Sequence, residues 1–269
     1  MKKIRWPDTC LFAKMTWPEI KEAAESGAIA LVVVAQIEEH GPHLPVDTDV
    51  LIGETVTLKA AEILKKRGIP VVVLPTVWSG YSEIDVTRFP GTISIRPTHL
   101  ANLLTDIGMS LVRSGFKKIG FVISHGQNRM AVEIAVRELR DRAKAQAAMF
   151  IFFSSEIDKK ILSSKEVHGG EGETSIYLAV APEYVDMEKA PKEPYVAKGR
   201  KASSALQSGL CWWTTWSVQR TKSGIFGDAT LATKEKGEAL VDAYANLLAD
   251  MLEEYYRSPY VSPEEHGEG

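Results

Sequence analysis

The sequence has 269 residues, of which 45% are hydrophobic and 25% charged, and its formal net charge at pH 7 is −3. This composition is ordinary for a globular protein, and the absence of a basic stripe excludes general binding to nucleic acid. The two cysteines, Cys10 and Cys211, have no motif spacing, so we expect no disulfide framework and predict a cytoplasmic location. Apolar runs are too short for a membrane span, and the amino terminus lacks a signal-peptide core, so no membrane partner is predicted.

Strand and helix signals alternate along the chain. Helices are predicted at about 17–26, 52–67, 98–114, 129–147, 174–181 and 234–257, and buried strands at 30–36, 71–75, 118–123 and 148–153. The strands are continuous apolar runs rich in Val, and Gly68 and Gly115 end the helices that precede them. Such alternation is typical of an α/β fold in which helices cover both faces of a mostly parallel sheet.

Residues 1–257 are predicted to form one domain, because no linker or repeat divides them. The polar tail 258–269 is predicted to be disordered. Residues 186–235 show no regular periodicity and are predicted to form long loops over the site. Within this stretch Trp213, which lies between Trp212 and Trp216, is a candidate wall of a substrate pocket. Packing or a subunit interface is the alternative for these aromatic residues.

The segment after the first long strand concentrates ionisable side chains. Residues 38–49 contain four carboxylates and two imidazoles. Glu38 and His40 alternate on an extended segment and so point to the same face, and a turn at Gly41 lets Asp49 return to the same point. Carboxylates combined with imidazole suit Zn, Mn or Fe, so the segment predicts one or two divalent metal ions. A solvated acidic loop is the alternative that the spacing leaves open.

Polar side chains also follow later strands. His125 ends the third strand at the sheet edge that carries Glu38 and His40, which favours a metal ligand over a structural histidine. His168 and Glu173 lie on a glycine-rich loop and suit general acid–base catalysis beside a metal-activated water. A helix cap without chemistry is the alternative for that loop.

Two further residues are candidate substrate contacts. Gln127 is a poor ligand for Zn, so its role stays open between substrate and water. Tyr81 lies on the loop that follows the second strand. The Gly and Pro residues of that loop are structural by default.

Taken together, these segments resemble the creatininase (creatinine amidohydrolase) family. Four ordered blocks carry the resemblance: Glu-Glu-His-Gly-Pro-His-Leu-Pro with Thr-Asp in 38–49, Phe-Pro-Gly-Thr-Ile-Ser in 89–94, His-Gly-Gly with Glu-Thr-Ser in 168–175, and Gly-Asp with Ala-Thr-Lys-Glu-Lys-Gly in 227–237. The resemblance implies a three-layer α/β/α fold, assembly into a hexamer, and a site with two divalent metals, Zn or Mn, bridged by a carboxylate and a water.

The resemblance also implies roles for single residues. Glu38, His40 and His125 become metal ligands, and Asp49 becomes the bridging carboxylate. Glu173 matches the family glutamate that binds or faces the second metal.

His168 matches the acid–base histidine of the family. The chain departs from the family at Gln127, where creatininase has a ligand Glu, and at 84–86, where the usual Glu-His is missing. The metal-binding residues of the family are therefore expected in this chain, whereas creatinine is not expected to be its substrate.

The predicted function is that of a metal-dependent hydrolase that opens or cleaves a small polar cyclic substrate, with a cyclic amide as the family default. Zn is the first expected metal, with Mn or Fe as alternatives. Ring-opening carbon–carbon hydrolysis of a cyclic polyol ketone, of the 3-dehydro-scyllo-inosose type, is the alternative chemistry. A non-catalytic metal-binding subunit of an assembly is the alternative outside enzymes. The expected partners are the small cyclic substrate and further copies of the chain.

Overall fold

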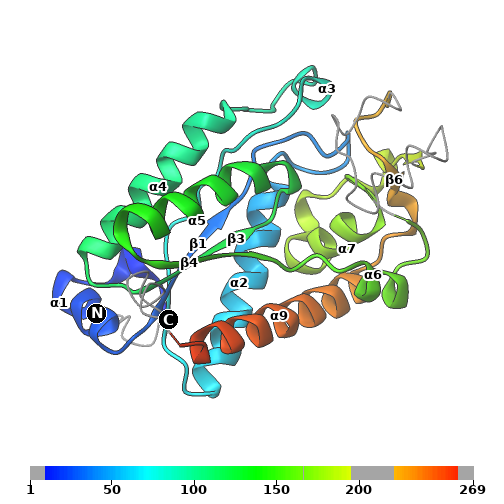
Figure 1. Cartoon of the computed structure of the whole chain (residues 1–269). Coiled ribbons are helices and arrows are strands. Elements are labelled where there is room, and N and C mark those ends of the chain that lie inside the picture. Colours follow the sequence, from blue (N-terminus) through cyan, green and yellow to red (C-terminus); the bar gives the residue numbers. More distant parts are fainter. Residues whose placement is uncertain (1–9, 166, 195–220, 260–269) are drawn as a thin grey trace, which may run out of the picture.

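The protein is described by a computed structural model that covers residues 10–165, 167–194 and 221–259. Its main sheet has four parallel strands in the order β2-β1-β3-β4. The strands are β1 (Ile29–Val34), β2 (Val71–Val73), β3 (Lys118–Ile123) and β4 (Gln146–Ile151). Figure 1 shows helices on both sides of this sheet, which confirms the predicted three-layer α/β/α architecture.

The helices divide between the two faces of the sheet. One face is covered by α1 (Trp17–Glu25), α4 (Pro97–Arg113) and α5 (Arg129–Ala143). The other is covered by α2 (Thr48–Lys66), α7 (Glu171–Val180) and α9 (Lys234–Arg257). Shorter elements are α3 (Ile84–Thr87), α6 (Ser155–Ile161), β5 (Lys192–Glu193), β6 (Gly227–Asp228), and the 3-10 helices η1 (Phe12–Lys14), η2 (Gly126–Asn128), η3 (Pro182–Tyr184), η4 (Met187–Lys189) and η5 (Ala229–Leu231).

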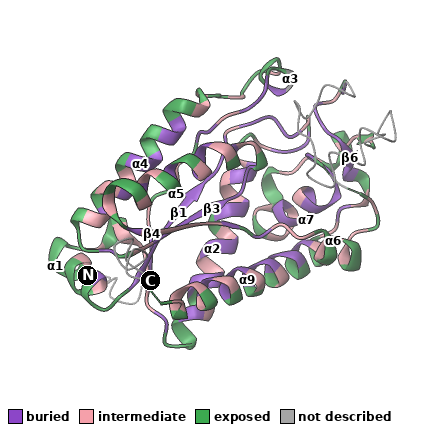
Figure 2. Cartoon of the chain, in the orientation of Figure 1, coloured by how far each residue is buried: buried purple, intermediate pink, exposed green. Residues whose placement is uncertain are grey.

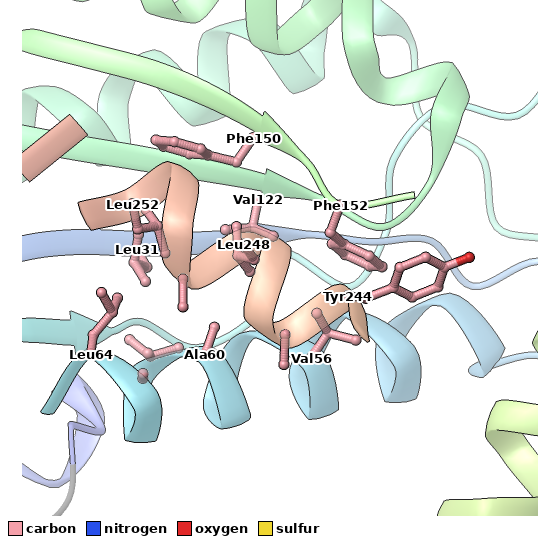
Figure 3. Packing of buried hydrophobic residues seen from close by; sticks show 14 of the residues in the cluster. Leu31, Val56, Ala60, Leu64, Val122, Phe150, Phe152, Tyr244, Leu248 and Leu252 are labelled. Carbon is pink, nitrogen blue, oxygen red and sulfur yellow. The ribbon is translucent and has the colours of Figure 1, made fainter. Parts of the chain in front are cut away.

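Successive side chains of a strand pack on opposite faces of the sheet, and both faces of β1 are fully buried. In β1, Leu31 packs towards α2 and α9, whereas Val32 packs towards α4 and α5. Figure 2 shows β1 and β3 buried and the outer faces of the helices exposed, whereas the edge strand β4 is mostly of intermediate burial. Figure 3 shows the hydrophobic cluster on the α2 and α9 side of the sheet, where Leu31 and Val122 from the sheet pack against Val56 of α2 and Leu248 of α9. Each such aliphatic side chain contributes about 1.5–3 kcal/mol when fully buried.

Close packing of α2 against the sheet brings its first turn to the carboxyl ends of the strands. A Cβ atom at Gly53 would lie 2.7 Å from Ser124 Oγ and 2.8 Å from Val33 Cγ1. The helix can approach this closely only because residue 53 has no side chain. Asp49, one turn earlier on the same helix, is thereby held beside the ends of β1 and β3.

Several element boundaries differ from the prediction. Helix α2 begins at Thr48 rather than at 52, because the acidic run at 47–49 forms a first turn that the helix dipole stabilises. Helix α7 likewise begins at Glu171 rather than at 174. Helix α5 ends at Ala143 rather than at 147, since Lys144 adopts a left-handed conformation with φ 52°. Strand β4 accordingly spans 146–151 instead of 148–153. The Ala-rich sequence there contains no Gly or Pro to mark the break.

Some predictions fall on residues that the structure does not describe. Trp212, Trp213 and Trp216 lie outside the described residues, as do residues 260–269 of the tail. The described parts of 186–235 form only short elements joined by loops. None of the helices within the described ranges has the length and apolar character needed to cross a membrane.

Candidate metal centre and its cavity

The ionisable residues singled out in the sequence meet at the carboxyl edge of the sheet. They are Glu38, His40, Asp49, His125, His168 and Glu173. All are buried except Glu173, whose side chain is 16% exposed. Their donor atoms form three overlapping groups among the described residues, each with its atoms within 4.8 Å of one another. The groups are Glu38–Asp49–His125, His40–Asp49–Glu173 and Glu38–His40–His168.

Backbone carbonyls fix the orientation of the two predicted ligand histidines. His40 Nδ1 lies 3.0 Å from the carbonyl oxygen of Glu38, and His125 Nε2 lies 3.0 Å from that of Tyr81. A carbonyl oxygen can only accept, so each of these ring nitrogens carries the hydrogen and donates it. The lone pair of a neutral ring is then on His40 Nε2 and on His125 Nδ1. A carbonyl partner of this kind is usual behind metal-binding histidines.

Asp49 lies between these two lone pairs. Its Oδ1 is 3.4 Å from His40 Nε2, and its Oδ2 is 3.1 Å from His125 Nδ1. Each oxygen of one carboxylate therefore faces a different imidazole, which is the arrangement that a bridge between two cations needs. Burial raises the pKa of Asp49, but the adjacent imidazoles of His40 and His125 outweigh it and lower this pKa.

The buried carboxylates of the centre favour a positive charge beside them. Burial lowers the pKa of His125, but the carboxylates of Glu38 and Asp49 outweigh it and raise this pKa to about 9. Glu38 Oε1, His40 Nε2 and Asp49 Oδ2 are buried without a hydrogen-bond partner among the described residues. A buried polar atom left without a partner costs about 1–3 kcal/mol. A bound cation would satisfy all three atoms, so these residues fit the divalent metals that the sequence predicts.

Glu38 is held by a chain of buried polar side chains that the sequence analysis missed. Its Oε2 accepts a hydrogen bond of 2.5 Å from Ser82 Oγ, which in turn accepts one from Gln36 Nε2. Gln36 Oε1 accepts from the backbone N–H of Gly80 at 2.7 Å. This chain fixes one oxygen of Glu38 and leaves Oε1 for the centre. No spacing signals it, because Ser82 is 44 residues from Glu38.

His168 approaches the centre from the loop before α7. Its Nε2 donates to the carbonyl oxygen of Glu39 at 2.8 Å, so its Nδ1 carries the lone pair and lies 3.4 Å from Glu38 Oε1. Its ring stacks on that of His40, with the centroids 4.4 Å apart. Burial and the charge of His40 lower the pKa of His168, but Glu39 and Glu38 outweigh them and raise it.

Glu173 completes the second group from the first turn of α7. Its Oε2 lies 3.8 Å from His40 Nε2 and accepts a hydrogen bond of 2.6 Å from the backbone N–H of Gly169. A carboxylate in the first turn of a helix is stabilised by the helix dipole. Together with the hydrogen bond from Gly169, this position directs the carboxylate of Glu173 at the centre.

A cavity of about 670 Å³ opens from these residues between α5, α6, α7 and α9. Gln127 lines it, and its Oε1 accepts a hydrogen bond of 2.7 Å from the backbone N–H of Glu83, so its contact with substrate stays a prediction. Tyr81 is not among the described residues that line the cavity, and its contribution to the site is the carbonyl behind His125. Trp213 lies outside the described residues.

Comparison with known proteins assigns the fold and the family. The family model for creatininase, described as creatinine amidohydrolase, matches residues 13–252. The chain belongs to the creatininase family. Solved structures of creatininase have the same fold, and one matches with a TM-score of 0.77 at 23% identity over 93% of this chain and 99% of that one. Creatininase is also solved in a manganese form and, as a Glu-to-Gln mutant, in a Zn–Zn form.

Curated relatives of this creatininase-family chain catalyse different hydrolyses. The mycofactocin precursor peptide peptidase of Mycolicibacterium smegmatis is 31% identical over 84% of the chain and 85% of its own length. The 3-dehydro-scyllo-inosose hydrolase of Thermotoga maritima is 26% identical, with 93% and 86% covered. The creatinine amidohydrolase of Pseudomonas putida is 24% identical, with 90% and 96% covered. The chain is therefore a creatininase-family hydrolase, and the family alone does not name its substrate.

Proposed function

We propose that the protein is a two-metal hydrolase that cleaves a carbonyl–nitrogen bond in a small polar substrate, with a cyclic amide as the first candidate. The observation that carries this proposal is the position of Asp49, each of whose oxygens faces a different imidazole. When bound, one cation would be held by Glu38, Asp49 and His125, and the other by His40, Asp49 and Glu173. Zn is the first expected metal, and the Zn–Zn and Mn forms of solved creatininases support Zn or Mn.

Metal ions at this centre, when bound, supply a water of lowered pKa and polarise the substrate carbonyl. His168 is proposed as the general acid–base. Its Nε2 keeps its hydrogen on the carbonyl of Glu39, so the proton that moves in the reaction enters and leaves at Nδ1. That atom lies on the side of Glu38 and can pass its proton to the leaving nitrogen. The Glu39 carbonyl holds the ring in place through both states.

The second candidate is ring-opening hydrolysis of a cyclic polyol ketone. The Thermotoga maritima relative, which matches 93% of this chain, supports it. The same groups would act, but His168 would deliver its proton to a leaving carbon instead of a nitrogen. The two candidates therefore differ in the substrate and share the machinery.

Assembly and location are proposed with the function. Further copies of the chain, forming a hexamer in the cytoplasm, would cover large apolar side chains that are exposed in the described chain, such as Trp17 at 77% and Ile84 at 81%. Light scattering at micromolar concentration tests this, since a monomer mass would contradict it.

The test of the function combines metal analysis with turnover. Protein purified without chelator is assayed for Zn, Mn and Fe, and then with cyclic amides, lactones and cyclic ketones. Turnover of an amide supports the first candidate, and turnover of a ketone alone supports the second. Bound metal with no turnover of either class would support the third hypothesis, a non-catalytic metal-binding subunit.

A further inference from the structure

The cavity extends beyond the metal centre into a second region, here called the distal end. It is formed by Phe153, Leu162 and Ile176 together with Asp158 and Tyr244. The first three are apolar, and the ring of Tyr244 packs edge-on against Phe153 at 5.7 Å. Figure 3 shows the Tyr244 hydroxyl pointing away from the hydrophobic cluster. The hydroxyl donates a hydrogen bond to Asp158 Oδ1, so the distal end has apolar walls and one polar pair.

The charge of the cavity wall beyond the metal groups is negative. Its carboxylates are Glu83, Glu133 and Asp158, and Arg129 is its one lysine or arginine among the described residues. Arg129 Nε lies 2.9 Å from Glu133 Oε1, so its charge is already matched. Asp158 has the Tyr244 hydroxyl as its side-chain partner, with no ion pair to a described lysine or arginine. Burial raises its pKa and the Tyr244 hydrogen bond lowers it less, as expected for a carboxylate without a neighbouring cation.

The size of the cavity also points to a larger substrate. At about 30 Å³ per water molecule, 670 Å³ corresponds to about twenty waters, so a single small ring at the metals fills only part of it. The cavity is also lined by the apolar side chains of the distal end and by Asp158. A substrate that reaches this carboxylate needs an apolar spacer and a group that can pair with it.

We propose that the cavity takes a two-part substrate, in which the hydrolysed carbonyl lies at the metal centre and a cationic ammonium or amidinium group pairs with Asp158 and Tyr244. The proposal rests on the proposed hydrolase function and adds a class of substrate to it. A charge-assisted hydrogen bond to the Asp158 carboxylate would hold the cation, while the apolar walls bury the spacer. Phosphate-bearing or carboxylate-bearing substrates are disfavoured, because they would face Glu83 and Asp158.

Three matched hydroxamates test this by calorimetry on the metal-loaded protein. Each has the same metal-chelating head and alkyl spacer, and the tails are ammonium, methyl and carboxylate. We expect the ammonium compound to bind about tenfold more tightly than the methyl compound, and the carboxylate compound to bind more weakly still. Asp158→Asn should remove the preference for ammonium with metal content unchanged, and Tyr244→Phe should weaken it while keeping the packed ring.

The control is Glu156→Gln, which removes an exposed charge from the same helix without touching the cavity and should leave all three affinities as they are. Equal affinity for the three tails in the unmodified protein overturns the two-part substrate alone, whether or not Asp158→Asn folds. If no hydroxamate binds and no metal is present, the proposed hydrolase function fails, and the two-part substrate fails with it.

Discussion

The two ends of the cavity are built in different ways. The metal end consists of buried ionisable residues on loops and helix starts at the carboxyl edge of the sheet, where Asp49 and Glu173 each occupy a first turn. At the distal end, Asp158, Ile176 and Tyr244 come from within α6, α7 and α9, and Phe153 and Leu162 flank α6. The first end is suited to one chemistry on a carbonyl group. Substitutions at the second end can change which substrate binds without altering the residues that act on the carbonyl group. The type of reaction and the choice of substrate therefore depend on different residues.

The largest effect is expected from removing the carboxylate that both ligand groups share. Asp49→Asn takes one charge from both ligand groups and should abolish binding of both metals together with activity, because each cation loses an anionic donor. Metal content is measured after dialysis against trace Zn. The matched control is Glu62→Gln on the exposed side of the same helix, which should retain full metal. Full metal content in Asp49→Asn would falsify the bridge.

The next largest effect is expected for His168. His168→Ala should keep its metal and lose turnover by about 10²–10⁴-fold, which is the usual contribution of a general acid–base group. The control is His99→Ala, which changes an exposed histidine on α4 and should leave metal content and turnover unchanged. Loss of metal in His168→Ala, with activity restored by added metal, would instead make His168 a ligand in the group with Glu38 and His40.

Metal affinity and the stability of the metal-free protein should both depend on pH. The pKa of His125 in the metal-free protein is raised to about 9 from an ordinary value of about 6.5. Protonated His125 cannot bind a cation, so apparent metal affinity should rise up to about tenfold per pH unit between pH 6.5 and 9 for this group. A raised pKa stabilises the metal-free fold below pH 6.5, and this stabilisation is lost as the pH rises through 9.

The melting temperatures report the same linkage. The difference in Tm between metal-loaded and metal-free protein should therefore widen from pH 6.5 to 9. Thermal unfolding at fixed free Zn concentration measures it. A constant difference across this range would mean that metal binding displaces no proton from the centre.

The smallest effect is expected from the residues behind the ligands. Ser82→Ala removes the hydrogen bond to Glu38 Oε2 and should weaken metal affinity by about 10–100-fold, the usual loss when a partner of a metal ligand is removed. The conservative variant Ser82→Thr keeps the hydroxyl and should restore part of the affinity. Competition with a chelator of known affinity measures both variants. Unchanged affinity in Ser82→Ala would show that Glu38 is held well enough without it.

The sequence predicted the metal end more fully than the distal end. Glu38, His40 and Asp49 could be found because ionisable residues cluster after an apolar strand, and the strands themselves are unbroken apolar runs. Ser82 could not be found, since a single serine far along the chain shows no pattern until folding brings it to Glu38.

The distal end was missed for a related reason. Asp158 sits in a short helix with charged neighbours, where it resembles any surface residue, and Tyr244 falls on the apolar face of α9, where it resembles any core residue. Only the packing of α6 on α9 brings the two together. The order of the strands depends likewise on the packing of helices over the sheet, which the strand sequences do not encode.

The carbonyls that hold the histidine rings belong to the backbone, and this insulates the metal centre from change around it. His125 is oriented by the main chain of Tyr81 and His168 by the main chain of Glu39, so a different side chain at either position leaves the hydrogen bond in place. The catalytic geometry can therefore be inherited intact while the neighbouring side chains diverge. A family built in this way can exchange one substrate for another by substitutions around the cavity without rebuilding its centre.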